Sequence, residues 1–232
     1  MVSRLKILVL VDNEDGERVR GTWGWSVLVE TEKWKALFDA DSSPEVMREN
    51  AEALGVDLSK LDFAVLSHDH WDHIGGFPYI GQVSRGLTVY VPAGVEEEFE
   101  KWGLKPVVVR EPVKVAEDAW VIGPVATGLY GIVEQALAVS VEGKGLVVIV
   151  GCSHPGVDVM CQRAIEATGE DRVYLVIGGF HGPSQTTLDR LASKTKLIAP
   201  AHCSGEAAKL YVKTRYPDKY VGVKSGIEIT IE

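Results

Sequence analysis

The sequence predicts an α/β fold in which strands and helices follow one another along the chain. Short runs rich in Val, Ile and Leu recur throughout, and segments with helical spacing and capping residues lie between several of them. In addition, 46% of the 232 residues are hydrophobic, which is enough to bury a substantial core. This order of elements is typical of layered α/β domains. We treat residues 1–232 as one domain.

The predicted strands share short length and a high content of β-branched residues, both of which favour extended structure. They are residues 5–11, 25–30, 34–38, 63–66, 87–91, 107–109, 146–150, 173–177 and 196–199. The predicted helices begin or end at residues that favour helix termini, such as Ser43 with Pro44, Gly55 and Ser184. They are residues 45–54, 95–102, 157–167, 185–193 and 206–213.

Charge and composition exclude several classes of function. The formal net charge is −9 and Lys and Arg form no cluster, so nucleic-acid binding is not expected. The first apolar stretch ends at Val11, is too short to cross a membrane and lacks a cleavage site. Three cysteines are too few for a disulfide framework. We expect a cytoplasmic protein with a small-molecule substrate and no membrane partner; the sequence predicts no oligomeric state.

The six histidines are the most informative residues of the chain. Three lie within residues 67–73, which read Ser-His-Asp-His-Trp-Asp-His. The other three, His154, His181 and His202, each follow the end of an apolar strand. In open α/β sheets, ligand sites form beyond the carboxyl ends of strands, so all six histidines can meet at one edge.

The histidine cluster predicts metal binding. Three imidazoles and two carboxylates so close together are unfavourable in a purely structural loop, whereas a divalent cation offsets the acidic charge and accepts imidazole nitrogens. His68 and His70 share one side of an extended chain, while Asp72 and His73 follow a turn near Trp71. This arrangement suits two metal ions better than one.

The His-x-His-x-Asp-His pattern at residues 68–73, after a buried strand, resembles the signature of the metallo-β-lactamase superfamily. Upstream, residues 36–41 resemble the superfamily's strand that ends in an Asp, here Asp39. In the superfamily this Asp supports the metal ligands without binding metal itself. The resemblance covers residues 5–230 and implies a four-layer αββα sandwich with the metals at one edge of two packed sheets.

The same resemblance implies how the ligands are shared between two divalent ions. His68, His70 and His154 would hold one ion, and the other would be held by three further ligands, namely Asp72, His73 and His202. We expect zinc, with iron or manganese as alternatives.

The chain departs from the common pattern of the superfamily at the bridging ligand. Residues 74–153 contain no histidine, and Gly151-Cys152 stands where a Gly-Asp with a bridging Asp is expected. Cys152 is therefore either an additional metal ligand or a buried inert thiol, and we expect Cys203 to be a packing residue beside His202.

Residues 151–156, 178–181 and 201–205 resemble a narrower branch, described as superfamily II metal-dependent hydrolases. Some members of that branch are identified as the dihydropterin–ribofuranosylaminobenzene phosphate synthase of methanopterin biosynthesis.

The expected chemistry is hydrolysis, because two metal ions supply hydroxide at neutral pH. The substrate would be a small phosphorylated or cyclic ester. Asp72 would bind metal and orient the nucleophile, and Asp69 would support a histidine ligand as a hydrogen-bond partner. His181 has three open roles: a general acid, a group that binds an anionic substrate, or a structural residue at the strand end.

Two alternatives remain open. The first is a metal-dependent transferase that condenses a dihydropterin with a phosphorylated ribofuranosyl aminobenzene. The second is a non-catalytic metal-binding module, although structural zinc sites are usually closed cages dominated by cysteine.

Overall fold

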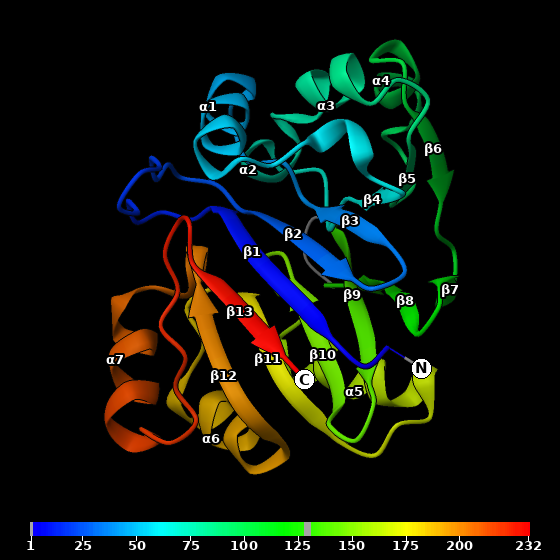
Figure 1. The fold of residues 1–232 in the computed structure, drawn as a ribbon. Coiled ribbons are helices and arrows are strands. Elements are labelled where there is room, and N and C mark those ends of the chain that lie inside the picture. The colour runs from blue at the N-terminus through cyan, green and yellow to red at the C-terminus, as the bar shows by residue number, and fades with distance from the viewer. Residues whose placement is uncertain (1, 128–130) are drawn as a thin grey trace. The chain divides into compact units, whose positions relative to one another are not determined.

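A computed structural model describes residues 2–127 and 131–232 (Figure 1). The described chain divides into two compact units. The first unit comprises Ser3–Arg110 with Lys224–Glu232, and the second comprises Val2 and the described residues of Glu111–Val223. The prediction that the chain is one domain stays a prediction.

The first unit contains a mixed sheet of seven strands among its described residues, in the order β13-β1-β2-β3-β4-β5-β6. Strands β3 to β6 are parallel, and β13, β1, β2 and β3 pair antiparallel. The bounds are β1 (Leu5–Val11), β2 (Ser26–Thr31), β3 (Lys35–Phe38), β4 (Phe63–Val65), β5 (Thr88–Val91), β6 (Lys105–Val108) and β13 (Glu228–Ile231). Because β3 and β4 are parallel, the residues that follow them, Asp39 and Ser67 with His68, lie at the same edge of the sheet.

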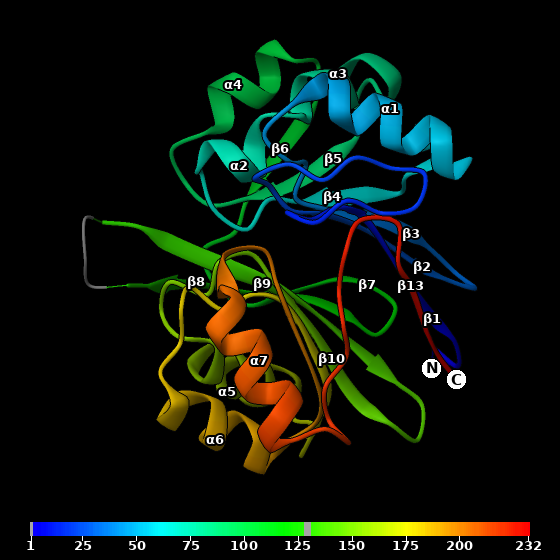
Figure 2. The same ribbon diagram turned by 90° about the vertical axis from the view of Figure 1, so that its left-hand side faces the viewer.

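Helices cover one face of this sheet (Figures 1 and 2). They are α1 (Pro44–Leu54), the short 3-10 helix η1 (Leu58–Lys60), α2 (Trp71–Ile74), α3 (Phe77–Val83) and α4 (Glu96–Lys101). Helix α1 begins where Ser43 Oγ accepts the N–H of Val46, and it ends at Gly55 in the left-handed conformation. Met47 and Phe77 are fully buried in the apolar core of this unit.

The second unit contains a sheet of six strands among its described residues, in the order β12-β11-β10-β9-β8-β7. The bounds are β7 (Val113–Ala116), β8 (Ala119–Ala126), β9 (Val133–Val141), β10 (Gly145–Val150), β11 (Val173–Gly179) and β12 (Thr195–Ala201). Strands β10, β11 and β12 are parallel, so the loops that follow them leave the sheet at one edge. The loop after β10 carries Cys152 and His154, the loop after β11 carries His181, and the segment after β12 carries His202 and Cys203.

Three helices, α5 (Val157–Thr168), α6 (Gln185–Lys194) and α7 (Glu206–Arg215), cover one face of the second sheet (Figure 2). A 3-10 helix, η2 (His202–Ser204), precedes α7. Each unit therefore has one sheet with helices over one face, as each half of an αββα sandwich requires. The described chain holds no helix that is long and apolar enough to span a membrane. The cytoplasmic location and the small-molecule partner stay predictions.

The predicted strands and the five predicted helices are all present, with ends shifted by a few residues. Among the described residues, four strands (β7, β8, β9 and β13), two α-helices (α2 and α3) and both 3-10 helices were not predicted. Gly123 and Pro124 interrupt the apolar run of β8, where the pairing with β9 is irregular. Glu134 and Gln135 break the apolar pattern of β9, although both are fully buried. Helices α2 and α3 are too short to show helical periodicity.

Candidate metal centre

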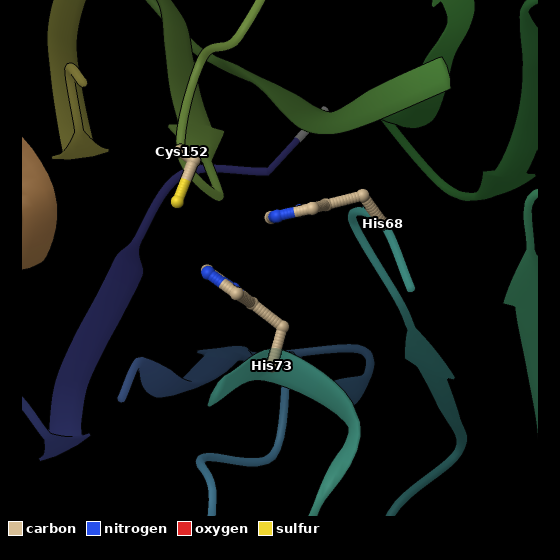
Figure 3. A group of neighbouring side chains, drawn as sticks. All are labelled: His68, His73 and Cys152. Atoms are coloured by element: carbon tan, nitrogen blue, oxygen red, sulfur yellow. The ribbon is translucent and has the colours of Figure 1, made fainter. Parts of the chain in front are cut away.

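The histidine cluster of the first unit lies in the segment that follows β4 and in the short helix α2, which contains His73. His68 and His73 are fully buried, with ring centroids 4.2 Å apart, and the rings of His68 and His70 are 4.5 Å apart. Figure 3 shows the ring nitrogens of His68 and His73 directed toward the same space. The segment therefore gathers several imidazole donors within a few ångströms.

Asp39 contacts two residues of this segment, Ser67 and His73, through hydrogen bonds. It is fully buried at the end of β3, in the left-handed conformation with φ 55°. Its Oδ1 accepts the backbone N–H of Ser67 at 2.7 Å, and its Oδ2 accepts the Ser67 hydroxyl at 2.7 Å. The same Oδ2 lies 2.7 Å from Nδ1 of His73.

These contacts fix which nitrogen of each ring can bind a metal. A carboxylate only accepts hydrogen bonds, so Nδ1 of His73 carries the proton and Nε2 keeps its lone pair. Nδ1 of His68 lies 2.9 Å from Ser67 Oγ, whose proton is already donated to Asp39, so that Nδ1 also donates. In both rings Nε2 is thus the unprotonated nitrogen, which is the form that binds metal. The hydrogen bonds at Nδ1 fix the orientation of each ring.

The remaining residues of the cluster differ in exposure. Asp72 is 6% exposed, and its Oδ2 lies 3.8 Å from Nε2 of His73, so both can reach one ion. His70 is half-buried. Asp69 is exposed and stands outside the Asp39 hydrogen-bond group; its predicted supporting role stays a prediction.

The second unit gathers donors from three loops at one sheet edge. The ligand atoms of Cys152, His154 and His181 lie within 4.8 Å of one another, as do those of Cys152, His202 and Cys203. Cys152, which follows β10 and is labelled in Figure 3, belongs to both groups. The ring centroids of His154 and His181 are 4.4 Å apart.

Glu134 is a site residue that the sequence analysis missed. It is fully buried in β9, and its Oε1 accepts the backbone N–H groups of Cys152 at 2.8 Å and Ser153 at 2.7 Å. Its Oε2 accepts the N–H of His154 at 2.7 Å. One carboxylate therefore holds the three residues of the loop that presents Cys152 and His154. An acidic residue inside an otherwise apolar run is a signal that could have identified it.

Each of these three loops has a non-glycine residue in the left-handed backbone conformation. The φ angles are 59° at Ser153, 50° at His181 and 46° at His202. Such residues are uncommon and cluster at functional sites, where surrounding contacts hold them in place. One such contact is the Ser153 hydroxyl, which donates to the carbonyl oxygen of Gly179 at 2.8 Å.

The thiols of the second unit fall into two kinds. Hydrogen bonding to Cys152 and to His181 holds the pKa of Cys203 well below its ordinary value, and the same contact with Cys203 raises the pKa of His181. Burial in the apolar core raises the pKa of Cys161, on α5, to about 12. Burial makes Cys161 an inert thiol, whereas the polar contacts of Cys203 favour loss of its proton.

The residues present fit a divalent transition metal. Imidazole nitrogens, a carboxylate and thiol sulfurs are the donors that zinc and related ions prefer, and Nε2 atoms of His68, His154 and His202 are shielded from solvent. The Asp39 contacts supply the supporting hydrogen bonds that metal-binding histidines usually have.

The family model of the metallo-beta-lactamase superfamily matches residues 21–202. The chain belongs to this superfamily. The resemblance noted in the sequence and the predicted fold class are thereby confirmed, and the superfamily usually binds divalent metals.

Individual relatives of the superfamily extend over nearly the whole chain. The chain is 25% identical to the 7,8-dihydropterin-6-methyl-4-(beta-D-ribofuranosyl)-aminobenzene-5'-phosphate synthase of Methanocaldococcus jannaschii, across 97% of this chain and 96% of the relative. The crystal structure of Tm1679, a metal-dependent hydrolase of the beta-lactamase superfamily, is similar with a TM-score of 0.83 and 25% identity, covering 98% of this chain and 99% of that one. The metallo-beta-lactamase fold protein YhfI of Bacillus subtilis has a TM-score of 0.69 at 16% identity, covering 99% of this chain and 100% of that one. This likeness shows the fold alone.

Proposed function

We propose that the protein is a metal-dependent hydrolase that uses two divalent metal ions, preferably zinc, on a small phosphorylated or cyclic ester substrate. The observation that carries the proposal is the Asp39–Ser67 network, which leaves Nε2 of both His68 and His73 ready to bind metal. Histidines that bind a metal usually donate their other ring N–H to such a carboxylate or to a similar acceptor, which supports the proposal.

The ligand sets follow the superfamily resemblance. We assign His68, His70 and His154 to one ion, supported by the adjacent rings of His68 and His70. To the second ion we assign the other three ligands, supported by the approach of Asp72 to Nε2 of His73: Asp72, His73 and His202. Cys152 is an additional ligand in this proposal.

Two such ions, when bound, lower the pKa of water and supply hydroxide at neutral pH. Around them, this chain contributes positioning and proton transfer. Asp72 has a second carboxylate oxygen that can accept a proton from the nucleophile and orient it. His181 is exposed beside His154, so its imidazole can reach a substrate and either protonate the leaving group or bind an anionic group.

A second candidate is a transferase that condenses a dihydropterin with a phosphorylated ribofuranosyl aminobenzene. The observation in its favour is the 25% identity to the Methanocaldococcus jannaschii synthase over nearly the full length of both chains. Both candidates use the same metal ligands, so the reaction catalysed distinguishes them.

The test combines metal analysis with substrate assays on protein purified without chelator. We expect about two zinc ions per chain, and hydrolysis of phosphoesters or lactones. His73→Ala should bind less metal and lose hydrolysis at least about 100-fold, whereas Cys161→Ala, which changes a buried thiol on α5, should match the wild type. Condensation without hydrolysis would favour the second candidate. Wild-type protein that binds no metal would overturn both.

A further inference from the structure

Two of the three cysteines meet at the edge of the second sheet, although they follow strands that are not neighbours. Cys152 follows β10 and Cys203 follows β12, and β11 lies between these strands in the sheet. Their sulfur atoms nevertheless lie within 4.8 Å of each other and of a ring nitrogen of His202. Cys203 Sγ also lies 3.8 Å from the carbonyl oxygen of Cys152.

Gly179, the last residue of β11, makes this meeting possible. A Cβ atom at this position would lie 2.6 Å from Cys203 Sγ and 3.2 Å from Cα of Cys152. Any residue with a side chain would therefore occupy the space into which Cys203 extends. The glycine at the end of the central strand leaves the space that the sulfur occupies.

We propose that Cys203 binds metal, so that Cys152, His202 and Cys203 form a sulfur-rich ligand group for one ion of the proposed centre. This rests on the proposed function and replaces the expectation that Cys203 only packs beside His202. Zinc binds sulfur at about 2.3 Å and imidazole nitrogen at about 2.0–2.1 Å, so donor atoms around one ion lie about 3.5–4 Å apart. Atoms already within 4.8 Å reach this spacing by small side-chain rotations.

The surroundings of the three donors fit an ion better than they fit simple packing. Cys152 is 4% exposed and His202 is 3% exposed, while Cys203 is half-buried and thus reachable by an entering ion. His202 is held in the left-handed conformation, with φ 46°, immediately before Cys203. Cys161 shows what a packing cysteine looks like in this chain, since it lies among apolar residues of the core.

Sulfur ligands determine which metals the centre accepts. Thiolates favour zinc and other soft or borderline ions over magnesium, manganese and calcium, which prefer oxygen. We therefore infer that the ion at this ligand group is zinc, or a thiophilic ion of similar size.

The test uses cobalt(II) as a spectroscopic substitute for zinc in the full-length protein. Cobalt bound to thiolate has a sulfur-to-metal charge-transfer absorption in the near ultraviolet, whereas visible ligand-field bands appear with any ligand set. We expect wild type and the matched control Cys161→Ser to show both kinds of absorption. Cys203→Ser should lose about half of the charge-transfer intensity and bind cobalt at least about tenfold more weakly. Cys152→Ser should likewise lose about half, because Cys203 still supplies one sulfur.

The outcomes separate this inference from the proposed function. Ligand-field bands in Cys203→Ser with unchanged charge transfer and affinity would overturn the role of Cys203 and leave the dinuclear hydrolase standing. A wild type without any cobalt bands would overturn the proposed function itself. If Cys203→Ser does not fold, zinc X-ray absorption of Cys152→Ser decides: a sulfur shell at about 2.3 Å supports the inference, and a shell of nitrogen and oxygen alone overturns it.

Discussion

Two buried carboxylates, Asp39 and Glu134, hold the candidate ligand segments, one in each unit. A buried charge is unfavourable unless several hydrogen bonds compensate for it. Asp39 contacts Ser67 and His73, and Glu134 accepts three consecutive backbone N–H groups. Neither needs to touch a metal. Each positions donors that would, so its replacement should affect metal binding more than general stability.

At the residue scale we predict that Glu134→Gln weakens metal binding about 10- to 100-fold. The amide keeps one acceptor oxygen but turns an NH2 group toward a backbone N–H, so at least one of the three hydrogen bonds is lost. Competition titration against a zinc-binding dye measures the affinity. Glu142→Gln, an exposed position just after β9, is the control. An equal affinity in Glu134→Gln and wild type would show that the loop keeps its form without the carboxylate.

At the scale of elements, parallel strands place the second unit's donors. Strands β10, β11 and β12 end at one edge, so short loops bring together residues from three distant segments of the chain. The last residues of the central strand, β11, must then be small. Gly178 and Gly179 lie close to the backbone of the preceding strand, with positions for a Cβ 2.1 Å from Val150 O and 2.5 Å from Gly151 O.

We predict that Gly179→Ala destabilises the protein by about 1–3 kcal/mol, because the new methyl group meets Gly151 O and Cys203 Sγ. Urea unfolding of the metal-free protein measures this loss without any contribution from metal. Gly222→Ala is the matched control: its Cβ would come no closer than 3.7 Å to other atoms, so we expect little change. Similar stabilities for the two variants would mean that β11 shifts to make room, and that the glycine is not needed there.

At the scale of the whole molecule, the proposed ion ligands come from both units, His68 to His73 from the first and residues 152 to 203 from the second. A ligand that binds only the folded chain stabilises it by mass action, by about 4 kcal/mol at a concentration 1,000-fold above its dissociation constant. Metal should therefore stabilise the complete chain.

We predict that chelation lowers the thermal unfolding midpoint, and that zinc restores it for both units together. Differential scanning calorimetry of chelated and zinc-reloaded protein measures this effect. Magnesium at the same concentration is the control, since it prefers oxygen ligands and should restore little. If zinc shifts the unfolding of one unit and leaves the other unchanged, the ions take their ligands from that unit alone, contrary to the proposed ligand sets.

The sequence by itself determined the fold class, most strands and helices, and the histidine and aspartate residues of the candidate centre. These features are local: apolar periodicity marks an element within a few residues, and the cluster from His68 to His73 spans a single loop. The resemblance to the superfamily extended this local pattern to His154 and His202. Strands β8 and β9 were not predicted because Gly, Pro, Glu and Gln interrupt their apolar runs.

Only the tertiary structure decided the parts that depend on contacts between distant segments. Glu134 meets the loop at Cys152 from 18 residues away, and Cys203 meets Cys152 across 51 residues. Asp39 meets His73 across 34 residues; the resemblance predicted a supporting role for Asp39 but not this partner. Such contacts follow from strand order and from which strand ends in glycine, and no single segment of the chain contains that information. The physical reason is that residues meet at a sheet edge when their strands are neighbours in the sheet, however far apart they are in the chain. Sequence patterns report only on residues that are close together along the chain.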